Sequence, residues 1–401
     1  MRPIEALTSL GQSLWYDNIQ RRLLESGDLQ RMITQGEIRG VTSNPSIFNY
    51  AITRTKDYDD ALMPMAWSGW KAEAIFWHLA QEDIQRTCDL FEPLYRETGG
   101  ADGYVSLEVH PGLAHDSQAT LKQVQHLWQT VNRPNLMIKI PATCQGLPAI
   151  RAAIARGINV NVTLIFSIER YHEVMEAYLC GLEDRLSVTN QAGVGNKLQF
   201  PTSVASFFVS RMDTKVDALL PESSGLRGKT AIANARLAYR AFLVTFKGPR
   251  WERLRLAGAR LQRPLWASTS TKNPAYPDTI YVENLIGADT VNTVPPQTLD
   301  AFRDHGKAAL TLNTGIDEAE EVFNALEEQG ISVTKVTREL EDEGVKAFAE
   351  AFEAMLTAIE KRRKDAQASL GNLNAAVQKR VAALEAAEYP ARLWRGDTAL
   401  W

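Results

Sequence analysis

The sequence predicts an α/β protein built as a (β/α)8 barrel, the TIM-barrel fold, with extra helices at its C-terminal end. Eight short apolar or β-branched runs alternate with longer segments of helical periodicity. Because parallel strands must be joined by crossovers, which are usually helical, this alternation indicates a parallel sheet. The runs are rich in buried-type residues at successive positions, a pattern typical of strands that are buried on both faces.

The eight predicted strands are, in chain order, SLWYD at 13–17, GVTS at 40–43, YVSLEV at 104–109, LMIKIP at 136–141, NVNVTLI at 159–165, VASFFVSR at 204–211, PLWAS at 264–268 and TVNTV at 290–294. Helical stretches are predicted at 20–36, 72–97, 117–131, 145–155, 167–186, 230–246 and 296–305. In enzymes of this fold the chemistry lies where the strands end at the C-terminal face of the barrel. Polar residues that finish these apolar strands are therefore the candidates for function.

The chain after residue 336 is strongly helical and charged, with helices predicted at 339–364 and 366–387. One face of the first helix is apolar, through Val345, Phe348, Phe352, Met355, Leu356 and Ile359. This face predicts a helix that covers the barrel; a helix that binds a partner is the alternative. Pro390 then breaks the helical pattern. We therefore divide the chain into a barrel with covering helices at 1–365 and a C-terminal helical extension and tail at 366–401.

Composition and charge favour a soluble, cytoplasmic protein. The 401 residues are 45% hydrophobic, and 44 basic against 48 acidic residues give a net charge of −4, which argues against a nucleic-acid or membrane surface. Three cysteines without CxxC spacing suit a reducing compartment. Neither a secretory signal nor a run of ~18 apolar residues is evident. No nucleotide-binding or zinc-binding motif stands out, so we expect no metal and no organic cofactor.

Lys139 is the most informative residue, because it lies between Ile138 and Ile140 in a predicted barrel strand. Lysine is almost never fully buried unless it is paired, and burial disfavours the ammonium form of the side chain. The neutral amine is the nucleophile that converts a ketone into an imine. The alternative is a lysine at a strand end that points to solvent or pairs with a carboxylate.

Two carboxylates also finish predicted strands. Asp17 ends SLWYD, where the alternative role is that of a helix N-cap. Glu108 lies near the end of YVSLEV, where the alternative is a salt bridge inside the barrel. If these two side chains converge near Lys139, they supply the proton transfers that imine chemistry needs.

Uncharged and cationic residues complete the set of candidates. Asn44, Asn161 and Thr163 can orient hydroxyls or a water molecule, although Asn44 before Pro45 is also an ordinary turn and Thr163 an ordinary β-former. Arg211 follows SFFVS, and Lys272 follows the hydroxyl-rich segment STST at 268–271. A cationic, hydroxyl-rich loop late in a barrel favours a phosphate site, with solvated surface charge as the alternative.

Taken together, these segments resemble the transaldolase family from about residue 10 to residue 348. The resemblance lies in WYDNIQ, GVTSNPSIF, VSLEV, IKIPAT, GINVNVTLIFS, SFFVSR and WASTSTKNPAY, which occur in this order. It implies a barrel of the class I aldolase type that transfers a dihydroxyacetone unit from sedoheptulose 7-phosphate or fructose 6-phosphate to glyceraldehyde 3-phosphate or erythrose 4-phosphate, in the pentose phosphate pathway.

The resemblance also implies a role for each candidate residue. Lys139 would form the Schiff base, Asp17 would be the general acid/base, and Glu108 with Thr163 would hold the water that relays protons. The residues implied in binding are Asn44, Asn161 and Ser206 for substrate hydroxyls, and Arg211, Ser270 and Lys272 for the phosphate.

Some features depart from the family pattern or leave alternatives open. Shorter members carry arginine at the position of Lys272, so a lysine here keeps the charge and loses the bidentate fork. A related aldolase that releases free dihydroxyacetone would carry glutamine at 108 and tyrosine at 208, whereas this chain has Glu108 and Phe208. A non-catalytic barrel that binds or scaffolds is the second rival.

The tail RLWRGDTALW resembles the junction found where a transaldolase is fused to a phosphoglucose isomerase. The alternative is a structural strap in which Trp394 and Trp401 pack on the barrel.

Overall fold

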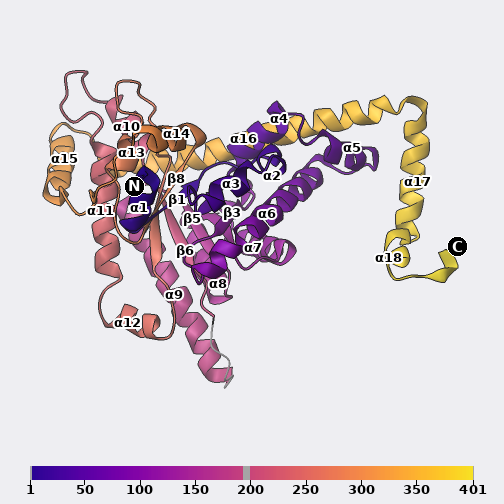
Figure 1. The fold of residues 1–401 in the computed structure, drawn as a ribbon, viewed down its shortest axis with the longest axis horizontal. Coiled ribbons are helices and arrows are strands. Elements are labelled where there is room, and N and C mark those ends of the chain that lie inside the picture. Colours follow the sequence, from indigo (N-terminus) through magenta and orange to yellow (C-terminus); the bar gives the residue numbers. More distant parts are fainter. Residues whose placement is uncertain (1, 193–198, 401) are drawn as a thin grey trace.

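A closed barrel of eight parallel strands forms the centre of the molecule (Figure 1), as the sequence predicts. The computed structural model describes residues 2–192 and 199–400. The strands pair in chain order, and the barrel closes where β8 pairs with β1 along its full length. Their bounds are β1 Gln12–Tyr16, β2 Gly40–Thr42, β3 Tyr104–Glu108, β4 Leu136–Pro141, β5 Val160–Ile165, β6 Ser203–Phe208, β7 Gln262–Ala267 and β8 Thr290–Val294.

Helices form the outer layer of the barrel and the connections between strands (Figure 1). In the described part of the chain they are α1 Pro3–Ser9, α2 Arg21–Glu25, α3 Asp28–Thr34, α4 Pro45–Arg54, α5 Asp59–Trp67, α6 Ala72–Glu97, α7 Ser117–Val131, α8 Gly146–Ala155, α9 Ile168–Ala192, α10 Ser210–Asp217, α11 Thr230–Thr245, α12 Pro249–Leu256, α13 Ile280–Glu283, α14 Pro296–His305 and α15 Ile316–Glu328, then α16 Val333–Ser369, α17 Asn374–Ala386 and α18 Tyr389–Trp394. Short 3-10 turns occur at Pro111–Leu113, Gly371–Leu373 and Thr398–Leu400. No helix in this part of the chain is both long enough and apolar enough to cross a bilayer.

One predicted helix, 20–36, is wrong as a single element, because the structure divides it into α2 and α3. The division falls at Gly27, whose φ of 78° lies in the left-handed region that glycine adopts without a steric penalty. By contrast, the predicted helices 72–97, 117–131 and 296–305 match α6, α7 and α14 at both ends.

Large side chains and one ionic cluster fill the barrel below its mouth. A Cβ at Gly40 in β2 would lie 2.6 Å from the ring of Trp15. A glycine at this position therefore leaves the room that the buried indole needs. At the opposite end from the mouth, Asp102 accepts hydrogen bonds from Ser13, Arg39 and Arg263. This buried cluster therefore fills the lower end of the barrel interior.

Strand β5 is irregular at the end that faces the mouth. Its pairing with β6 shifts register between Val162 and Ile165, and Leu164 has a φ of +61° although it is not glycine. A branched side chain in this region is uncommon and strained. The irregularity lies directly after Thr163, so it sets the direction in which β5 leaves the barrel next to that hydroxyl.

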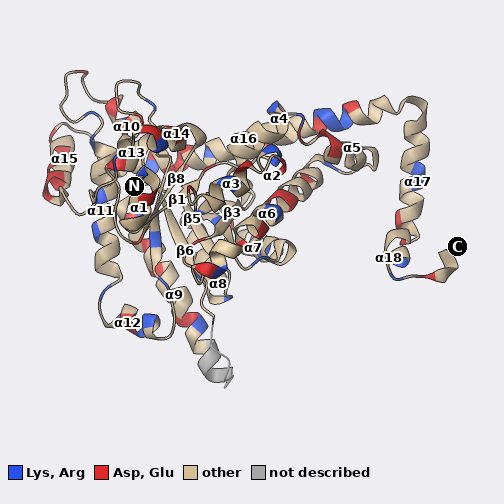
Figure 2. Ribbon diagram, viewed as in Figure 1, with Lys and Arg blue, Asp and Glu red and all other residues tan. Residues whose placement is uncertain are grey.

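Helix α16 covers the mouth of the barrel, as predicted, and then continues beyond it (Figure 1). It runs for 37 residues, and its buried face includes Phe348, Phe352 and Met355. Both basic and acidic residues occur along the helix, with a basic run near its far end (Figure 2). The predicted helix bounds 339–364 and 366–387 are wrong, because α16 continues to Ser369 and the chain turns at Gly371–Leu373 before α17.

The segment after α16 stands away from the barrel (Figure 1). Neither α17 nor α18 contains a buried residue, and Trp394 is 93% exposed. A hydrogen bond of 2.6 Å from Gln378 to the carbonyl of Trp67 ties α17 to α5. The strap interpretation is therefore wrong for Trp394, while Trp401 lies outside the described residues. The division of the chain at residue 365 stays a prediction.

Candidate active site

Lys139 lies inside the barrel mouth and is 4% exposed. It is on β4, where it pairs with Glu108 of β3 on one side and Asn161 of β5 on the other. Its Nζ donates a hydrogen bond of 2.9 Å to the carbonyl oxygen of Ser43 and lies 3.0 Å from Oε2 of Glu108. The amine is thus held by two partners and is shielded from bulk water.

Glu108 is a buried carboxylate whose charged partner is Lys139. Burial raises its pKa above the ordinary range, and the adjacent Lys139 opposes this rise. A carboxylate with a raised pKa, in contact with an amine, is suited to take up and return the protons of that amine. Both the predicted catalytic role and its alternative, a salt bridge inside the barrel, agree with this contact.

Asp17 follows β1 and lies in the same cavity as Lys139. Its Oδ1 accepts a hydrogen bond of 2.6 Å from the hydroxyl of Thr42, which also lies 2.6 Å from the hydroxyl of Thr293. Burial raises the pKa of Asp17, against the opposing effects of Thr42 and Lys139. The N-cap alternative is wrong, because the helix after it begins at Arg21 with Gln20 as its N-cap.

One cavity of about 200 Å³ at the C-terminal end of the strands collects most of the predicted site residues. Eight of them line it: Asp17, Asn44, Lys139, Thr163, Ser206, Arg211, Ser270 and Lys272. Further lining residues, which the sequence did not single out as site residues, include Thr42, Ser46, Phe208, Ser268, Thr293 and Phe348. Glu108 is not among the lining residues but contacts Lys139, which is. The convergence of an amine, a carboxylate, hydroxyls and cations makes this cavity the candidate active site.

Asn161 is fully buried and lies behind the cavity wall, not among the residues that line it. Its amide donates to the hydroxyl of Ser106 at 3.0 Å, and its Oδ1 accepts from the hydroxyl of Ser206 at 2.7 Å. Asn161 therefore orients Ser206, which does line the cavity. The neighbouring Thr163 hydroxyl forms no hydrogen bond with another described residue, so it is available to a water molecule or a substrate.

Asn44 lies at the N-cap of α4, where its Oδ1 accepts a hydrogen bond of 3.0 Å from the backbone N–H of Ile47. The turn interpretation and the site interpretation both apply, since the residue also lines the cavity. The cap uses one lone pair of the oxygen, and Asn44 can still offer its amide N–H₂ to a ligand.

Arg211 and Lys272 form the cationic side of the cavity. The predicted strand 204–211 is too long, because β6 ends at Phe208 and Arg211 lies in the first turn of α10. The guanidinium lies 5.2 Å from the ring of Phe208, and Lys272 donates a hydrogen bond of 2.6 Å to the Ser270 hydroxyl. Burial lowers the pKa of both cations, and the charge of Arg211 lowers that of Lys272 further.

The loop that carries Ser270 and Lys272 is tied to α10, the helix that carries Arg211. The hydroxyl of Tyr276 donates a hydrogen bond of 2.6 Å to Asp217 at the end of α10. A Cβ at Gly228 would lie 2.9 Å from the Tyr276 ring, so this glycine leaves room for the aromatic anchor. Tyr276 and Asp217 therefore fix the two halves of the cationic wall relative to each other.

Comparison with known proteins shows the family of the chain. The sequence pattern of the Transaldolase/Fructose-6-phosphate aldolase family matches residues 14–359. The chain belongs to this family. The Transaldolase of Thermobifida fusca (strain YX) is 49% identical over 360 residues, which cover 88% of this chain and 96% of that protein. The Transaldolase of Mycolicibacterium smegmatis is 46% identical, over 88% of this chain and 96% of that protein.

Phe348 is the lining residue that the sequence had assigned to a different role. Its place in the apolar stripe of α16 predicts burial, but local sequence gives no sign that the ring reaches the cavity. Ser46 and Thr293 were likewise not singled out, since a single hydroxyl near a strand end is common. Each could be recognised only from its place next to the neighbouring strands.

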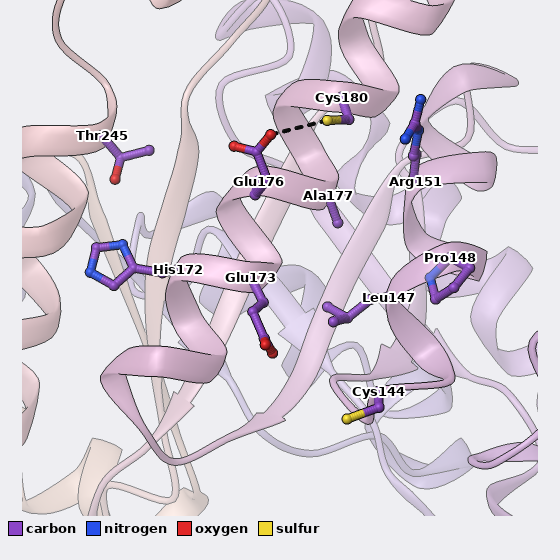
Figure 3. Close-up of a pocket in the computed structure, with 10 residues that line it drawn as sticks. All are labelled: Cys144, Leu147, Pro148, Arg151, His172, Glu173, Glu176, Ala177, Cys180 and Thr245. Atoms are coloured by element: carbon purple, nitrogen blue, oxygen red, sulfur yellow. Dashed lines mark hydrogen bonds between the residues drawn. The ribbon is translucent and has the colours of Figure 1, made fainter.

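A larger groove of about 720 Å³ lies outside the barrel (Figure 3) and lacks these features. Leu147 and Pro148 of α8 and Ala177 of α9 line it, with Cys144 near one end. Several of its polar groups already have partners, as in the Cys180–Glu176 contact of 3.2 Å and the 2.7 Å hydrogen bond from Arg151 to Asp184. No set of three or more His, Cys, Asp or Glu side chains in the described part of the chain is grouped to hold a metal.

Proposed function

We propose that this chain is a transaldolase that transfers a dihydroxyacetone unit from a ketose phosphate, sedoheptulose 7-phosphate or fructose 6-phosphate, to an aldose phosphate, glyceraldehyde 3-phosphate or erythrose 4-phosphate, through a Schiff base on Lys139. Membership of the Transaldolase/Fructose-6-phosphate aldolase family and the relatives named Transaldolase support this proposal. The observation that carries it is the buried Lys139 amine, 3.0 Å from Glu108 and in one cavity with Asp17.

The first stage is imine formation. Neutral Lys139 attacks the ketone carbon, and the resulting carbinolamine loses water to give an iminium. Glu108 accepts and returns the protons of these steps, because its carboxylate contacts Nζ directly. The free hydroxyl of Thr163 holds the water that connects Glu108 to the reacting carbon.

The second stage is cleavage of the bond between C3 and C4 of the ketose. Asp17 removes the proton of the C4 hydroxyl, the C3–C4 electron pair moves into the iminium, and an aldose phosphate leaves. A dihydroxyacetone enamine stays on Lys139 until a second aldose phosphate accepts it by the reverse steps. The protonated imine is the electron sink, so the reaction needs neither a metal ion nor an organic cofactor.

Binding groups hold the substrate at both ends. Asn44 and Ser206 contact the sugar hydroxyls, and Asn161 orients Ser206 through the 2.7 Å hydrogen bond. The phosphate is bound by the cationic wall of Arg211, Ser270 and Lys272, where the guanidinium supplies a fork and the ammonium a point charge. No ion pair joins either cation to a carboxylate in the described part of the chain, which leaves both charges for the phosphate.

An aldolase that releases free dihydroxyacetone is the second candidate, because the family includes both activities. Phe208 in the cavity and Glu108 beside Lys139 favour transfer over release. The test is to incubate the protein with fructose 6-phosphate, with and without erythrose 4-phosphate. Formation of sedoheptulose 7-phosphate, with turnover that depends on the acceptor, is expected. Equal turnover without the acceptor, accompanied by free dihydroxyacetone, would assign the aldolase activity instead.

Two further proposals concern the surroundings of the protein. The thiols of Cys88, Cys144 and Cys180 form no disulfide, which favours a reducing compartment, and we place the protein in the cytoplasm. The family match ends at residue 359, before the end of α16, so the segment after it lies outside the matched barrel. We relate this segment to the junction of transaldolase–phosphoglucose isomerase fusions, on the strength of the RLWRGDTALW phrase.

A further inference from the structure

Helix α16 brings one aromatic side chain from outside the barrel into the candidate active site. Phe348 is 5% exposed and lines the cavity. Its ring centroid lies 5.8 Å from Nζ of Lys139 and 5.9 Å from Cζ of Arg211. The ring therefore lies within 6 Å of both the amine and the guanidinium and forms the part of the cavity wall that α16 supplies.

The position of Phe348 depends on a glycine one helical turn earlier. A Cβ at Gly344 would lie 3.0 Å from Cδ2 of Leu164, the residue with positive φ at the end of β5. The Cβ of an alanine at this point would be too close to Leu164, and one of the two elements would have to move by a few tenths of an ångström. Gly344 thus allows α16 to approach β5 closely, and residues four apart lie on the same face of a helix. The same close approach carries Phe348 over Lys139.

Ion pairs hold this part of α16 on both flanks. Lys215 of α10 lies 2.8 Å from Glu339 and also pairs with Glu343. On the other flank, Arg170 of α9 lies 3.2 Å from Glu341. These contacts connect α16 to the helices that follow β5 and β6, and so they keep the turn that carries Phe348 close to the ends of these strands.

We infer that Phe348 determines the fate of the enamine on Lys139 by keeping bulk water from it, an inference that rests on the proposed function. The enamine is lost as free dihydroxyacetone if its nucleophilic carbon takes a proton in place of the acceptor aldehyde. Water then adds to the iminium carbon and the C–N bond breaks, which consumes one water and regenerates the lysine amine. The water held by Glu108 and Thr163 suffices for the imine steps, whereas bulk water would supply the unwanted proton.

The experiment measures how one enamine partitions between two products. Each variant is given fructose 6-phosphate with a fixed concentration of erythrose 4-phosphate, and free dihydroxyacetone and sedoheptulose 7-phosphate are measured together. Phe348→Ala is expected to raise the ratio of release to transfer by about tenfold or more, since each factor of ten corresponds to about 1.4 kcal/mol in relative barrier height. Phe348→Leu, which keeps an apolar cover, is expected to raise the ratio by less than about threefold.

A matched control lies one turn further along the same helix. Phe352 packs against Phe76 at 5.2 Å and against Trp77, and it does not line the cavity. Phe352→Ala removes an equal aromatic ring from the buried face of α16 outside the cavity and is expected to leave the ratio unchanged. Gly344→Ala, which moves the helix away from β5 and keeps every other side chain, is expected to raise the ratio and serves if Phe348→Ala does not fold.

The ratio separates this inference from the function on which it rests. A ratio for Phe348→Ala equal to that of the unaltered protein, or an equal rise in Phe352→Ala, overturns the role of the ring. If Phe348→Ala cannot be purified, an unchanged ratio in Gly344→Ala has the same consequence. Absence of both products in the unaltered protein overturns the proposed transaldolase activity instead.

Discussion

Replacement of Arg211 by alanine tests whether the cationic wall binds the phosphate of the substrate. The guanidinium is partly buried between the rings of Phe208 and Phe348, at 5.2 and 5.9 Å, and forms no ion pair with a described carboxylate. A phosphate can therefore accept hydrogen bonds from two N–H groups of the Arg211 guanidinium. Hydrogen bonds that involve a charged group contribute about 1.5–3 kcal/mol each, so we expect Arg211→Ala to weaken binding by about 3 kcal/mol.

The assay compares two donors that differ only in the phosphate. With fructose 6-phosphate and saturating erythrose 4-phosphate, about 3 kcal/mol corresponds to a rise in KM of roughly 100-fold, with kcat changed by less than about threefold. With unphosphorylated fructose as donor, kcat/KM should change by less than about threefold. Arg211→Lys keeps the charge and loses the fork, so an intermediate rise of about tenfold is expected.

Two results would refute this reasoning. If Arg211→Ala reduces kcat/KM equally for fructose and fructose 6-phosphate, the side chain shapes the cavity and does not bind the phosphate. A fall in kcat at unchanged KM would instead place Arg211 in the chemical step.

Three other predictions follow from the site. Asp17→Asn should form the Schiff base with fructose 6-phosphate but lower the rate of glyceraldehyde 3-phosphate release by about 10²–10⁴-fold, the usual contribution of a positioned acid/base; a rate like that of the unaltered protein would remove Asp17 from its role. Burial raises the pKa of Asp17 and Glu108 above their ordinary 3.8 and 4.5. Since the carboxylates are the active forms, kcat/KM should begin to fall with decreasing pH while the pH is still above these ordinary pKa values. A pH profile of kcat/KM that is flat down to pH ~4 would contradict this. Tyr276→Phe removes the 2.6 Å hydrogen bond to Asp217 and should raise KM for fructose 6-phosphate by about two- to tenfold, with fructose unaffected; a loss in kcat with both donors would argue for a general structural role.

The strands and the reactive residues on them could be predicted because their signals are local. A polar residue within an apolar run is visible in the sequence itself, as for Lys139 between two isoleucines and for Glu108 after Leu107. The order of strands in a parallel barrel then brings neighbouring strand ends together, and the structure places these two side chains 3.0 Å apart.

The features that could not be predicted depend on contacts between distant segments. The residue after Phe208 is the apolar Val209, so no local signal in the sequence marks the end of β6. The backbone turns at this point, where the N–H groups of Val209 and Ser210 donate hydrogen bonds to carbonyl oxygens at the end of β7. Arg211 consequently belongs to a helix. Likewise, the ring of Phe348 reaches the cavity only because Gly344 meets Leu164, which is remote in sequence.

The amine of Lys139 is the centre of this account, and its covalent capture is the most direct test. The protein is incubated with fructose 6-phosphate, reduced with borohydride and analysed by peptide mass spectrometry, with Lys139→Met treated in the same way. We expect one reduced dihydroxyacetone or hexose adduct, located on Lys139 and absent from the variant, which should also lose transfer activity by several orders of magnitude. An adduct on a different lysine, or turnover by Lys139→Met at a substantial fraction of the normal rate, would contradict the account.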